Sequence, residues 1–270
     1  MTSRIHLVGQ LQRSRQEPEN VELIADRRPD LTEPERSAGL KWVDMRYDVG
    51  DVRHYGAIGD GIKDDSAAIQ DAFDSVGNGQ NVVFAPGQSY LISSVITQTS
   101  KNDISVIGNG ATLKEASGAL EAHLQFTSCD RLKIDGLDFE AGEDTTYFAA
   151  NTPAEERQFI ELITCDDVNV TNITGRNKRR LLTALTCPRL NVSGYSMVGF
   201  MGLASSPVAD ANNAPAVTYR GCDFATVSNG RVSNMGSAFL SQQSSAQLSV
   251  FGLVGEELHD NGVYVSSGDG

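Results

Sequence analysis

Apolar and polar residues alternate in short segments that recur along this chain. Six windows of nine residues share one order, with an apolar side chain at the fifth and seventh positions and Gly or Asn at the ninth. These windows begin at Ser100, Ser128, Thr164, Thr186, Gly221 and Ser244. Alternation with a period of two is typical of a half-buried strand, and Gly and Asn best tolerate a left-handed turn. Each window therefore predicts a strand that ends in a tight turn.

A second alternating segment precedes most of the windows. Its apolar pairs are Leu124/Phe126, Ile160/Leu162, Leu182/Ala184 and Val217/Tyr219. Successive windows begin 28, 36, 22, 35 and 23 residues apart. A core of 22–23 residues with variable loops fits the coils of a β-helix, in which neighbouring coils pair at about 4.8 Å. A leucine-rich repeat would need its own Leu/Asn pattern, and an immunoglobulin-like sandwich would not keep one register over six windows. The repeats therefore predict an all-β stack of coils.

The four cysteines follow the same repeat. Cys129, Cys165, Cys187 and Cys222 all occupy the second window position. They lack Cys-x-x-Cys spacing and a nearby paired His, so a zinc site is not indicated. We expect free thiols that stack in a column along one corner of the coils and pack as small residues.

Residues 52–73 combine a glycine-rich turn with a short amphipathic helix. Three glycines within positions 56–61 allow positive φ in tight turns. The run Asp64-Asp65-Ser66 offers short oxygen side chains that cap a helix N-terminus well. The helix then presents one apolar stripe, made of Ile69, Ala72, Phe73 and Val76.

This stretch resembles the opening of the pectate-lyase-like superfamily. There, a Gly-Ala-x-Gly-Asp-Gly turn, an Asp-Asp-Ser/Thr cap and an Ala-Ile-Gln helix precede a right-handed parallel β-helix. The resemblance implies a right-handed, single-stranded parallel β-helix whose first coil is covered by the short α-helix. It does not specify an activity, because the superfamily includes lyases, hydrolases, phage tailspikes and inert members. Of the polygalacturonase motifs only Asp166-Asp167 has a formal match, so that branch's catalytic residues are not carried over.

Carboxylates recur at the third window position, at Asp130, Asp166 and Asp223. Stacked carboxylates can chelate Ca²⁺, as an Asp cluster does in pectate lyases. Asp is also a routine turn residue, and this second interpretation is favoured. We therefore predict no cofactor or metal, with calcium kept as the less favoured alternative.

The chain divides into an arm and a body. Residues 1–47 are mostly polar and charged, with too few apolar side chains for a core of their own. We expect either a flexible arm or an arm that orders on a partner, and we favour the second, as a virion-attachment segment. Residues 48–270 should form the β-helix. A seventh window begins at Ser266, so we expect the last coil to be truncated or covered by another chain.

Charge and hydropathy exclude some partners. The formal net charge of −13 repels phosphate backbones, so nucleic acid is not expected. No apolar run is long enough to span a membrane. The N-terminus lacks the apolar core of a secretory signal, so export by that route is not indicated.

Two long spacings between windows locate two insertions, at 141–157 and 203–215. Both should leave the coils at one corner, with the basic run 176–180 between their bases. The predicted groove has carboxylates and aromatic rings on its walls, Glu140 among them, and a basic floor. Its candidate catalytic residues are Glu143, Asp144 and Asp210. Its candidate substrate-binding residues are Tyr147, Arg176, Lys178, Arg179 and Arg180. Paired carboxylates suit glycosidic cleavage, and a basic floor suits an acidic sugar; the alternative is two solvated loops around a basic turn.

Three functions compete on this evidence. The favoured one is a phage tailspike or receptor-binding tail protein of the virion. It would attach to other tail proteins through residues 1–47 and bind, and as a depolymerase cleave, host surface polysaccharide. The resemblance implies a homotrimer. The alternatives are a bacterial polysaccharide lyase or glycoside hydrolase, and a non-catalytic structural β-helix of an assembly.

Overall fold

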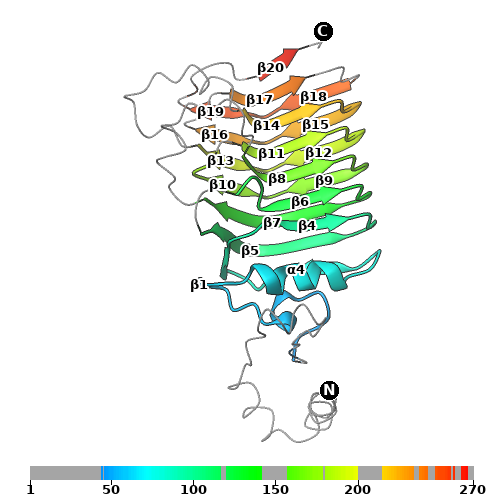
Figure 1. The fold of residues 1–270 in the computed structure, drawn as a ribbon. Coiled ribbons are helices and arrows are strands. Elements are labelled where there is room, and N and C mark those ends of the chain that lie inside the picture. Colours follow the sequence, from blue (N-terminus) through cyan, green and yellow to red (C-terminus); the bar gives the residue numbers. More distant parts are fainter. Residues whose placement is uncertain are drawn as a thin grey trace, which may run out of the picture.

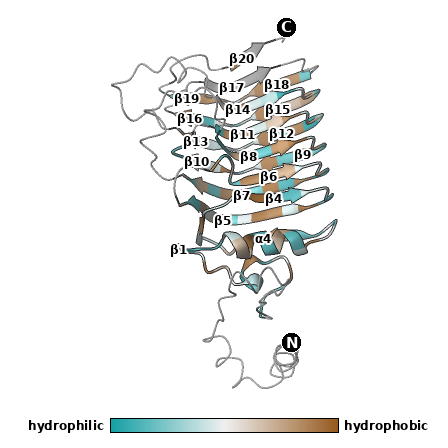
Figure 2. Cartoon of the chain, viewed as in Figure 1, coloured by the Kyte–Doolittle hydropathy of each residue, from teal (hydrophilic) through white to brown (hydrophobic). Residues whose placement is uncertain are grey.

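The chain folds as a stack of coils whose strands form parallel sheets (Figure 1). The computed structural model describes residues 44, 46–116, 120–141, 157–178, 180–199, 215–233, 237–242, 247–256, 258 and 263–266. Hydrophobic and hydrophilic residues alternate within the stacked strands (Figure 2). Parallel strands joined by crossovers wind in a right-handed sense. The fold is therefore the predicted all-β, right-handed parallel β-helix with a short α-helix at its N-terminal end.

Sheet B holds one strand from each coil. In spatial order it consists of β4 (Ile96–Thr99), β6 (Leu124–Thr127), β8 (Gln158–Ile163), β11 (Arg180–Leu185), β14 (Pro215–Arg220), β17 (Ser237–Gln242) and β20 (Val263–Ser266). Every neighbouring pair is parallel. Each coil thus adds one strand to this sheet, and the chain then continues into a second sheet, sheet A.

Sheet A holds two rows of strands joined by the long strands β5 (Ser105–Glu115) and β7 (Lys133–Glu140). The row that follows sheet B contains β9 (Val168–Thr171), β12 (Arg189–Ser193), β15 (Phe224–Ser228) and β18 (Gln247–Phe251). The other row contains β10 (Thr174–Arg176), β13 (Ser196–Val198), β16 (Arg231–Ser233) and β19 (Val254–Glu256). The incomplete first turn contributes β1 (Asp60–Asp64), β2 (Asn81–Val83) and β3 (Ser89–Ile92). A complete coil therefore has three strand segments around one core.

The strand register confirms the six sequence windows. Their seventh residues are successive partners in sheet A, in the order Val106, Ile134, Val170, Val192, Val227 and Val250. The ninth residue has positive φ in five windows, from Gly136 (71°) to Gly252 (65°). The first window differs, because the left-handed residues there are Asn109 and Gly110. Gly108 is needed for close approach instead, since a Cβ on it would lie 2.3 Å from the Gly136 carbonyl oxygen.

The second predicted strand is also confirmed. Its apolar pairs are in register across sheet B, with Leu124 beside Ile160, Leu182 beside Ile160, and Val217 beside Leu182. These side chains belong to one continuous buried core that runs through the coils. Burial of this apolar surface is the main stabilising contribution to such a stack.

The four cysteines form the predicted column of buried free thiols. The Cys129 amide donates to Cys165 Sγ at 3.3 Å. Each thiol also donates to a carbonyl of the preceding coil, as Cys165 does to Phe126 O at 3.5 Å. We call this turn between sheet B and sheet A the thiol corner, which comprises residues 128–131, 164–167, 186–188 and 221–223.

Polar side chains at the third window position join neighbouring coils at the thiol corner. Asn102 Oδ1 accepts from the Asp130 amide, and Asp130 Oδ1 accepts from the Asp166 amide, both at 3.0 Å. These carboxylates therefore act as turn residues that link one coil to the next. Within the described ranges, no group of three or more His, Cys, Asp or Glu side chains is arranged to hold a metal ion.

Helix α4 (Ser66–Ser75) covers the N-terminal end of the stack (Figure 1). Its predicted apolar stripe is buried, including Ile69 and Phe73. Lys101 occupies the cysteine position of the first window, and its ammonium donates to Phe73 O, Asp74 O and Val76 O at 2.6–3.2 Å. A cation at the helix C-terminus satisfies carbonyls that have no partner within the helix.

The predicted helix cap differs in detail. Asp64 accepts from the Ser66 amide at 2.9 Å, as a capping side chain should. Asp65 occupies the cap position but makes no side-chain cap bond. Its carboxylate instead accepts from the amides of Ile58 and Gly59, at 2.8 and 2.9 Å. Asp65 therefore holds the glycine turn onto the helix start.

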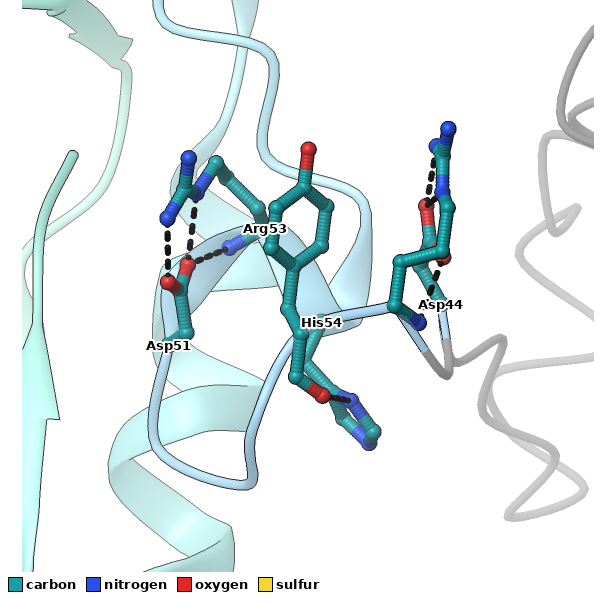
Figure 3. Close-up of polar contacts among 6 residues, drawn as sticks. Asp44, Asp51, Arg53 and His54 are labelled. Atoms are coloured by element: carbon teal, nitrogen blue, oxygen red, sulfur yellow. Dashed lines mark hydrogen bonds and ion pairs between the residues drawn. The ribbon is translucent and has the colours of Figure 1, made fainter.

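The segment before α4 is held by two Arg–Asp pairs around one aromatic ring. Arg53, in the 3-10 helix η1 (Val52–Tyr55), pairs with Asp51 at 2.6 Å (Figure 3). Arg46 pairs with Asp44 at 2.6 Å. The two guanidinium carbons lie 4.2 and 5.7 Å from the Tyr47 ring centroid. Ordered contacts thus reach back to Asp44, inside the predicted arm. None of the described helices has the length and apolar character that a membrane span requires.

Candidate functional site

The bases of the two insertions lie at one corner of the stack, as the sequence predicts. The first insertion follows Glu140 at the end of β7, and the second follows β13. Arg176, at the end of β10, is the register partner of Glu140 on one side and of Val198 on the other. The bases are therefore two coils, or about 10 Å, apart. We call this region, from the ends of β7, β10 and β13 to the starts of β8, β11 and β14, the insertion corner.

Several candidate residues fall outside the described residues. These are Glu143, Asp144 and Asp210, proposed as catalytic, and Tyr147 and Arg179, proposed to bind substrate. Their roles stay predictions. The described candidates are Arg176, Lys178 and Arg180.

The described basic residues do not form the exposed floor that the sequence suggests. Arg176 is exposed and lies beside Glu140, in the row of sheet A that contains β10 and β13. Lys178 and Arg180, in contrast, are buried, with 3% and 9% of their surface exposed. A lysine and an arginine are rarely buried without partners. The basic run therefore has an internal role as well as a surface one.

Lys178 belongs to a buried polar cluster with Glu115 and His123. The Lys178 ammonium lies 3.0 Å from Glu115 Oε2, and His123 Nε2 lies 3.1 Å from the same oxygen. The amide of Leu120 donates to the other carboxylate oxygen. Glu115 and His123 are 1% and 0% exposed. The three side chains come from the end of β5, the segment before β6 and the turn after β10. The cluster thus joins parts of three coils.

The surroundings shift the pKa of each member. Burial alone would raise the pKa of Glu115, but the His123 hydrogen bond, the Lys178 charge and the Leu120 amide lower it to about 2. Burial, with the Lys178 charge, lowers the pKa of His123 to about 4. Burial lowers the pKa of Lys178 to about 8, against the attraction of Glu115. At neutral pH, Glu115 and Lys178 are charged and His123 is neutral.

Aromatic rings enclose this cluster. The His123 ring lies 4.8 Å from Phe159 and 5.8 Å from Phe139, and these two phenyl rings stack at 5.2 Å. The Lys178 ammonium lies 5.3 Å from the Phe159 centroid. This apolar enclosure strengthens the electrostatic contact between Lys178 and Glu115, because the local dielectric constant is low.

Polar side chains are also buried on the outer face of sheet B. Ile160, Leu182 and Val217 belong to the core, so alternation places the residues after them, Glu161, Thr183 and Thr218, on the outer side. Thr183 donates to Gln158 Oε1 at 3.4 Å, and Arg180 is the register partner of Gln158, so Gln158 and Arg180 lie on the outer side as well. Apart from Glu161, which is half-buried, these side chains are buried.

Glu161 is the one carboxylate in the described strands of sheet B. Its Oε2 accepts from Gln125 Nε2 of the preceding coil at 2.5 Å. Its other neighbour in the sheet is Thr183. Amide, hydroxyl, guanidinium and carboxylate groups on one face supply both donors and acceptors. Such a face is suited to a hydroxyl-rich ligand.

The sequence contains a pattern that could have predicted the buried polar side chains on this face, although the six windows do not include it. Two consecutive buried apolar residues stand near the start of three strands, at Phe159-Ile160, Leu181-Leu182 and Ala216-Val217. This doubling interrupts the alternation and moves Gln158 and Arg180 to the outer side. The Glu115–Lys178 pair had no such signal, because the two residues are far apart in the chain.

The fold and the repeat have a counterpart among known families. Residues 50–175 match the family described as rhamnogalacturonase A/epimerase, pectate lyase-like. The chain carries a pectate-lyase-like β-helix. The stretch from Val52 to Phe73, from which the sequence analysis inferred this superfamily, lies within the match.

Individual proteins with this pectate-lyase-like β-helix differ in function. The endo-xylogalacturonan hydrolase of Aspergillus tubingensis is 19% identical, with a TM-score of 0.56 over 73% of this chain and 56% of that one. PfbA, a surface adhesin of Streptococcus pneumoniae, is 15% identical, with a TM-score of 0.57 over 75% of this chain and 56% of that one. These likenesses show the fold.

One curated relative is closer in sequence over a shorter segment. Plasmin and fibronectin-binding protein A of Streptococcus pneumoniae is 35% identical over an alignment of 105 residues, and the match covers 36% of this chain and 14% of that protein. The chain therefore spans a small part of this relative, and little more than half of the two solved structures.

Proposed function

We propose that this protein binds a polysaccharide across the outer face of sheet B, next to the insertion corner. The observation that supports this most is the half-buried Glu161 and the exposed Arg176 at this edge, next to a layer of buried polar side chains, Gln158, Arg180, Thr183 and Thr218. The outer face of a β-helix strand is ordinarily solvated, so a buried polar layer behind the accessible carboxylate and guanidinium supports a built surface. The hydrolase with this fold, named for its action on xylogalacturonan, supports a carbohydrate ligand.

We propose further that the polysaccharide contains acidic sugars. The chain has a net charge of −13, yet Arg157, Arg176 and Arg180 lie at the insertion corner, where the charge of Lys178 is balanced by Glu115. A local positive potential attracts anionic ligands to this corner, while the acidic surface elsewhere repels them. Arg176, which is exposed, is the residue most suited to contact a sugar carboxylate directly.

We propose that the protein also cleaves the bound polysaccharide. Glycosidases use two carboxyl groups across the scissile bond, one as acid and one as base or nucleophile. Glu161 supplies one carboxylate on the proposed binding face. Glu143, Asp144 and Asp210 are the candidates for its partner. The chain is proposed as a depolymerase on this chemistry alone.

The biological setting proposed is a phage tail. In this proposal residues 1–47 attach to tail proteins, the chain assembles as a homotrimer, and the β-helix contacts the host surface. The resemblance of the opening stretch to a superfamily that includes tailspikes supports it. Light scattering that finds a stable monomer, or virions that incorporate a chain lacking residues 1–47, would contradict it.

A surface adhesin is the second candidate function. The 35% identity to a segment of plasmin and fibronectin-binding protein A favours it. Biolayer interferometry with fibronectin and with plasmin separates the two candidates. Saturable protein binding that soluble glycan does not displace would support the adhesin.

The central test is binding and cleavage of polygalacturonate and of rhamnogalacturonan fragments. Glu161→Gln should abolish cleavage, and Arg176→Ala should weaken binding about tenfold, since a charge-assisted hydrogen bond contributes roughly 1.5–3 kcal/mol. Asp167→Asn is the matched control, because this exposed residue of the same coil lies at the opposite, thiol corner. Equal binding by all three variants would reject this face as the site.

A further inference from the structure

We propose that Glu115 and Lys178 are positioning residues for the site: their ion pair fixes the turn after β10 against the first coil and so sets where Arg176 and Arg180 lie. The proposal rests on the proposed function for its biological meaning. Its structural content, a clamp that holds the insertion corner, can be tested without any ligand.

The pair bridges two coils across a third. Lys114, Glu140 and Arg176 are register partners on successive coils, so Glu115 and Asn177 are also two coils, or about 10 Å, apart. Lys178 and Glu115 span this gap with their side chains and meet at 3.0 Å. In the intervening coil the equivalent residue is Ala141, which is buried and too small to block the contact. The clamp therefore passes the point where the first insertion begins.

The pair holds backbone that belongs to the site. Lys178 lies between Arg176, which is exposed, and Arg180, which is on the outer face of sheet B. The Asn177 amide donates to Val198 O, where the second insertion begins, and the Arg180 amide donates to Arg157 O, where the first one ends. A displacement of Lys178 would therefore shift both insertion bases together with the two arginines.

Global stability alone does not explain a charged pair at this position. Replacing a buried ion pair by apolar side chains of similar volume is often neutral or stabilising, whereas the charged pair fixes one geometry. His123 strengthens this geometry, because its neutral ring must carry the proton on Nε2 to donate to Glu115. Within the part of the chain that the structure describes, His123 Nδ1 is buried without a hydrogen-bond partner. The ring thus serves Glu115 alone.

Loss of the Lys178 proton should not open the clamp. The charged or titratable groups that face Lys178 are Glu115 from β5, His123 from the segment before β6 and Arg157 from the segment before β8. Burial lowers the pKa of Lys178 from 10.5 to about 8, so between these values an opened clamp binds the extra proton, and rising pH favours the closed form. An arginine at the same position keeps its charge and can keep the pair with Glu115.

The test is hydrogen exchange measured by mass spectrometry on the segment 174–185, at pH 7 and pH 9.5, with protection factors corrected for intrinsic exchange. In the native protein, protection should not fall between these pH values. Lys178→Met and Glu115→Gln should lower protection at pH 7 at least about tenfold. Lys178→Arg, which keeps the charge, should restore most of it. Lys133→Met, which removes an exposed lysine of β7, is the control and should follow the native profile.

Two outcomes would overturn the proposal. One is a native protection that falls through pH 8, and the other is a Lys178→Met protection equal to that of Lys133→Met. Polygalacturonate affinity of the native protein and of Lys178→Met then separates positioning from ligand binding. If exchange follows the clamp but no glycan binds to either protein, the positioning role stands and the proposed function fails.

Discussion

The two corners that flank sheet B differ in how their polar groups are used. At the thiol corner four successive coils repeat a buried cysteine, and Asn102 and Asp130 each accept a hydrogen bond from the amide of the next coil. At the insertion corner no two coils are alike, and one pair of charges spans three of them. Repetition spreads stability over many equal contacts. Irregularity concentrates it in a few side chains, and function is more often built on such sites.

The largest difference should appear when one charge of the insertion-corner clamp is removed. Lys178→Met leaves the Glu115 carboxylate buried with only His123 and the Leu120 amide as partners. Breaking a buried pair in this way should lower the free energy of unfolding by about 3 kcal/mol. Urea denaturation followed by circular dichroism measures it. The double variant Glu115→Leu/Lys178→Met should recover most of the loss, and a double variant as unstable as the single one would contradict this account.

The next largest effect should come from acid, through His123. Its folded-state pKa of about 4 is below the ordinary value of 6.5, so the unfolded chain binds more protons between these pH values. The free energy of unfolding should therefore be fully retained above pH 6.5 and fall by roughly 3 kcal/mol as the pH drops to 4. Glu115, with a pKa of about 2, extends the loss to lower pH.

Substitution of His123 separates this contribution from general acid denaturation. His123→Phe should flatten the stability profile between pH 6.5 and pH 4, while leaving the steeper loss below pH 4. If the His123→Phe and native profiles are parallel, the imidazole is not the group that titrates.

The comparison also explains how far the sequence could predict the structure. At the thiol corner four coils share a cysteine, so the windows predicted the register and the cysteine column, and the unequal spacing of the windows located the insertion bases at the other corner. They did not predict the left-handed conformation of Ser100, Ser128, Thr164 and Thr186, whose φ values are 54–55°. Serine and threonine have no preference for that region, so the packed coil imposes it.

At the insertion corner, prediction failed where contacts join distant residues. The run from Arg176 to Arg180 is highly polar, and such a run is normally solvated. Lys178 can be buried because it pairs with Glu115, which is 63 residues earlier in the chain and so gives no local signal. Periodicity predicts which residues are neighbours along a strand or in adjacent coils. It does not predict a contact between side chains that are two coils apart.

A smaller effect is expected within the cysteine column. Cys165→Ala and Cys187→Ala should each lower the free energy of unfolding by about 1 kcal/mol, because each removes one buried sulfur from a closely packed position. The two losses should be nearly equal, since both thiols have the same contacts with the preceding coil. Thermal denaturation of the two variants measures this. A difference of more than about 1 kcal/mol would show that the repeat is not energetically uniform.

The smallest effect should come from the exposed face of the thiol corner. Arg189 pairs with Asp166 at 2.7 Å, but both side chains are substantially solvated. Exposed ion pairs contribute little, so Arg189→Gln should change the free energy of unfolding by no more than about 0.5 kcal/mol. Arg176→Gln is the matched arginine at the insertion corner, where polygalacturonate binding should weaken although stability changes equally little. If Arg189→Gln weakened binding as much as Arg176→Gln, the ligand would respond to net charge rather than to one corner, and the distinction between the corners would apply to stability alone.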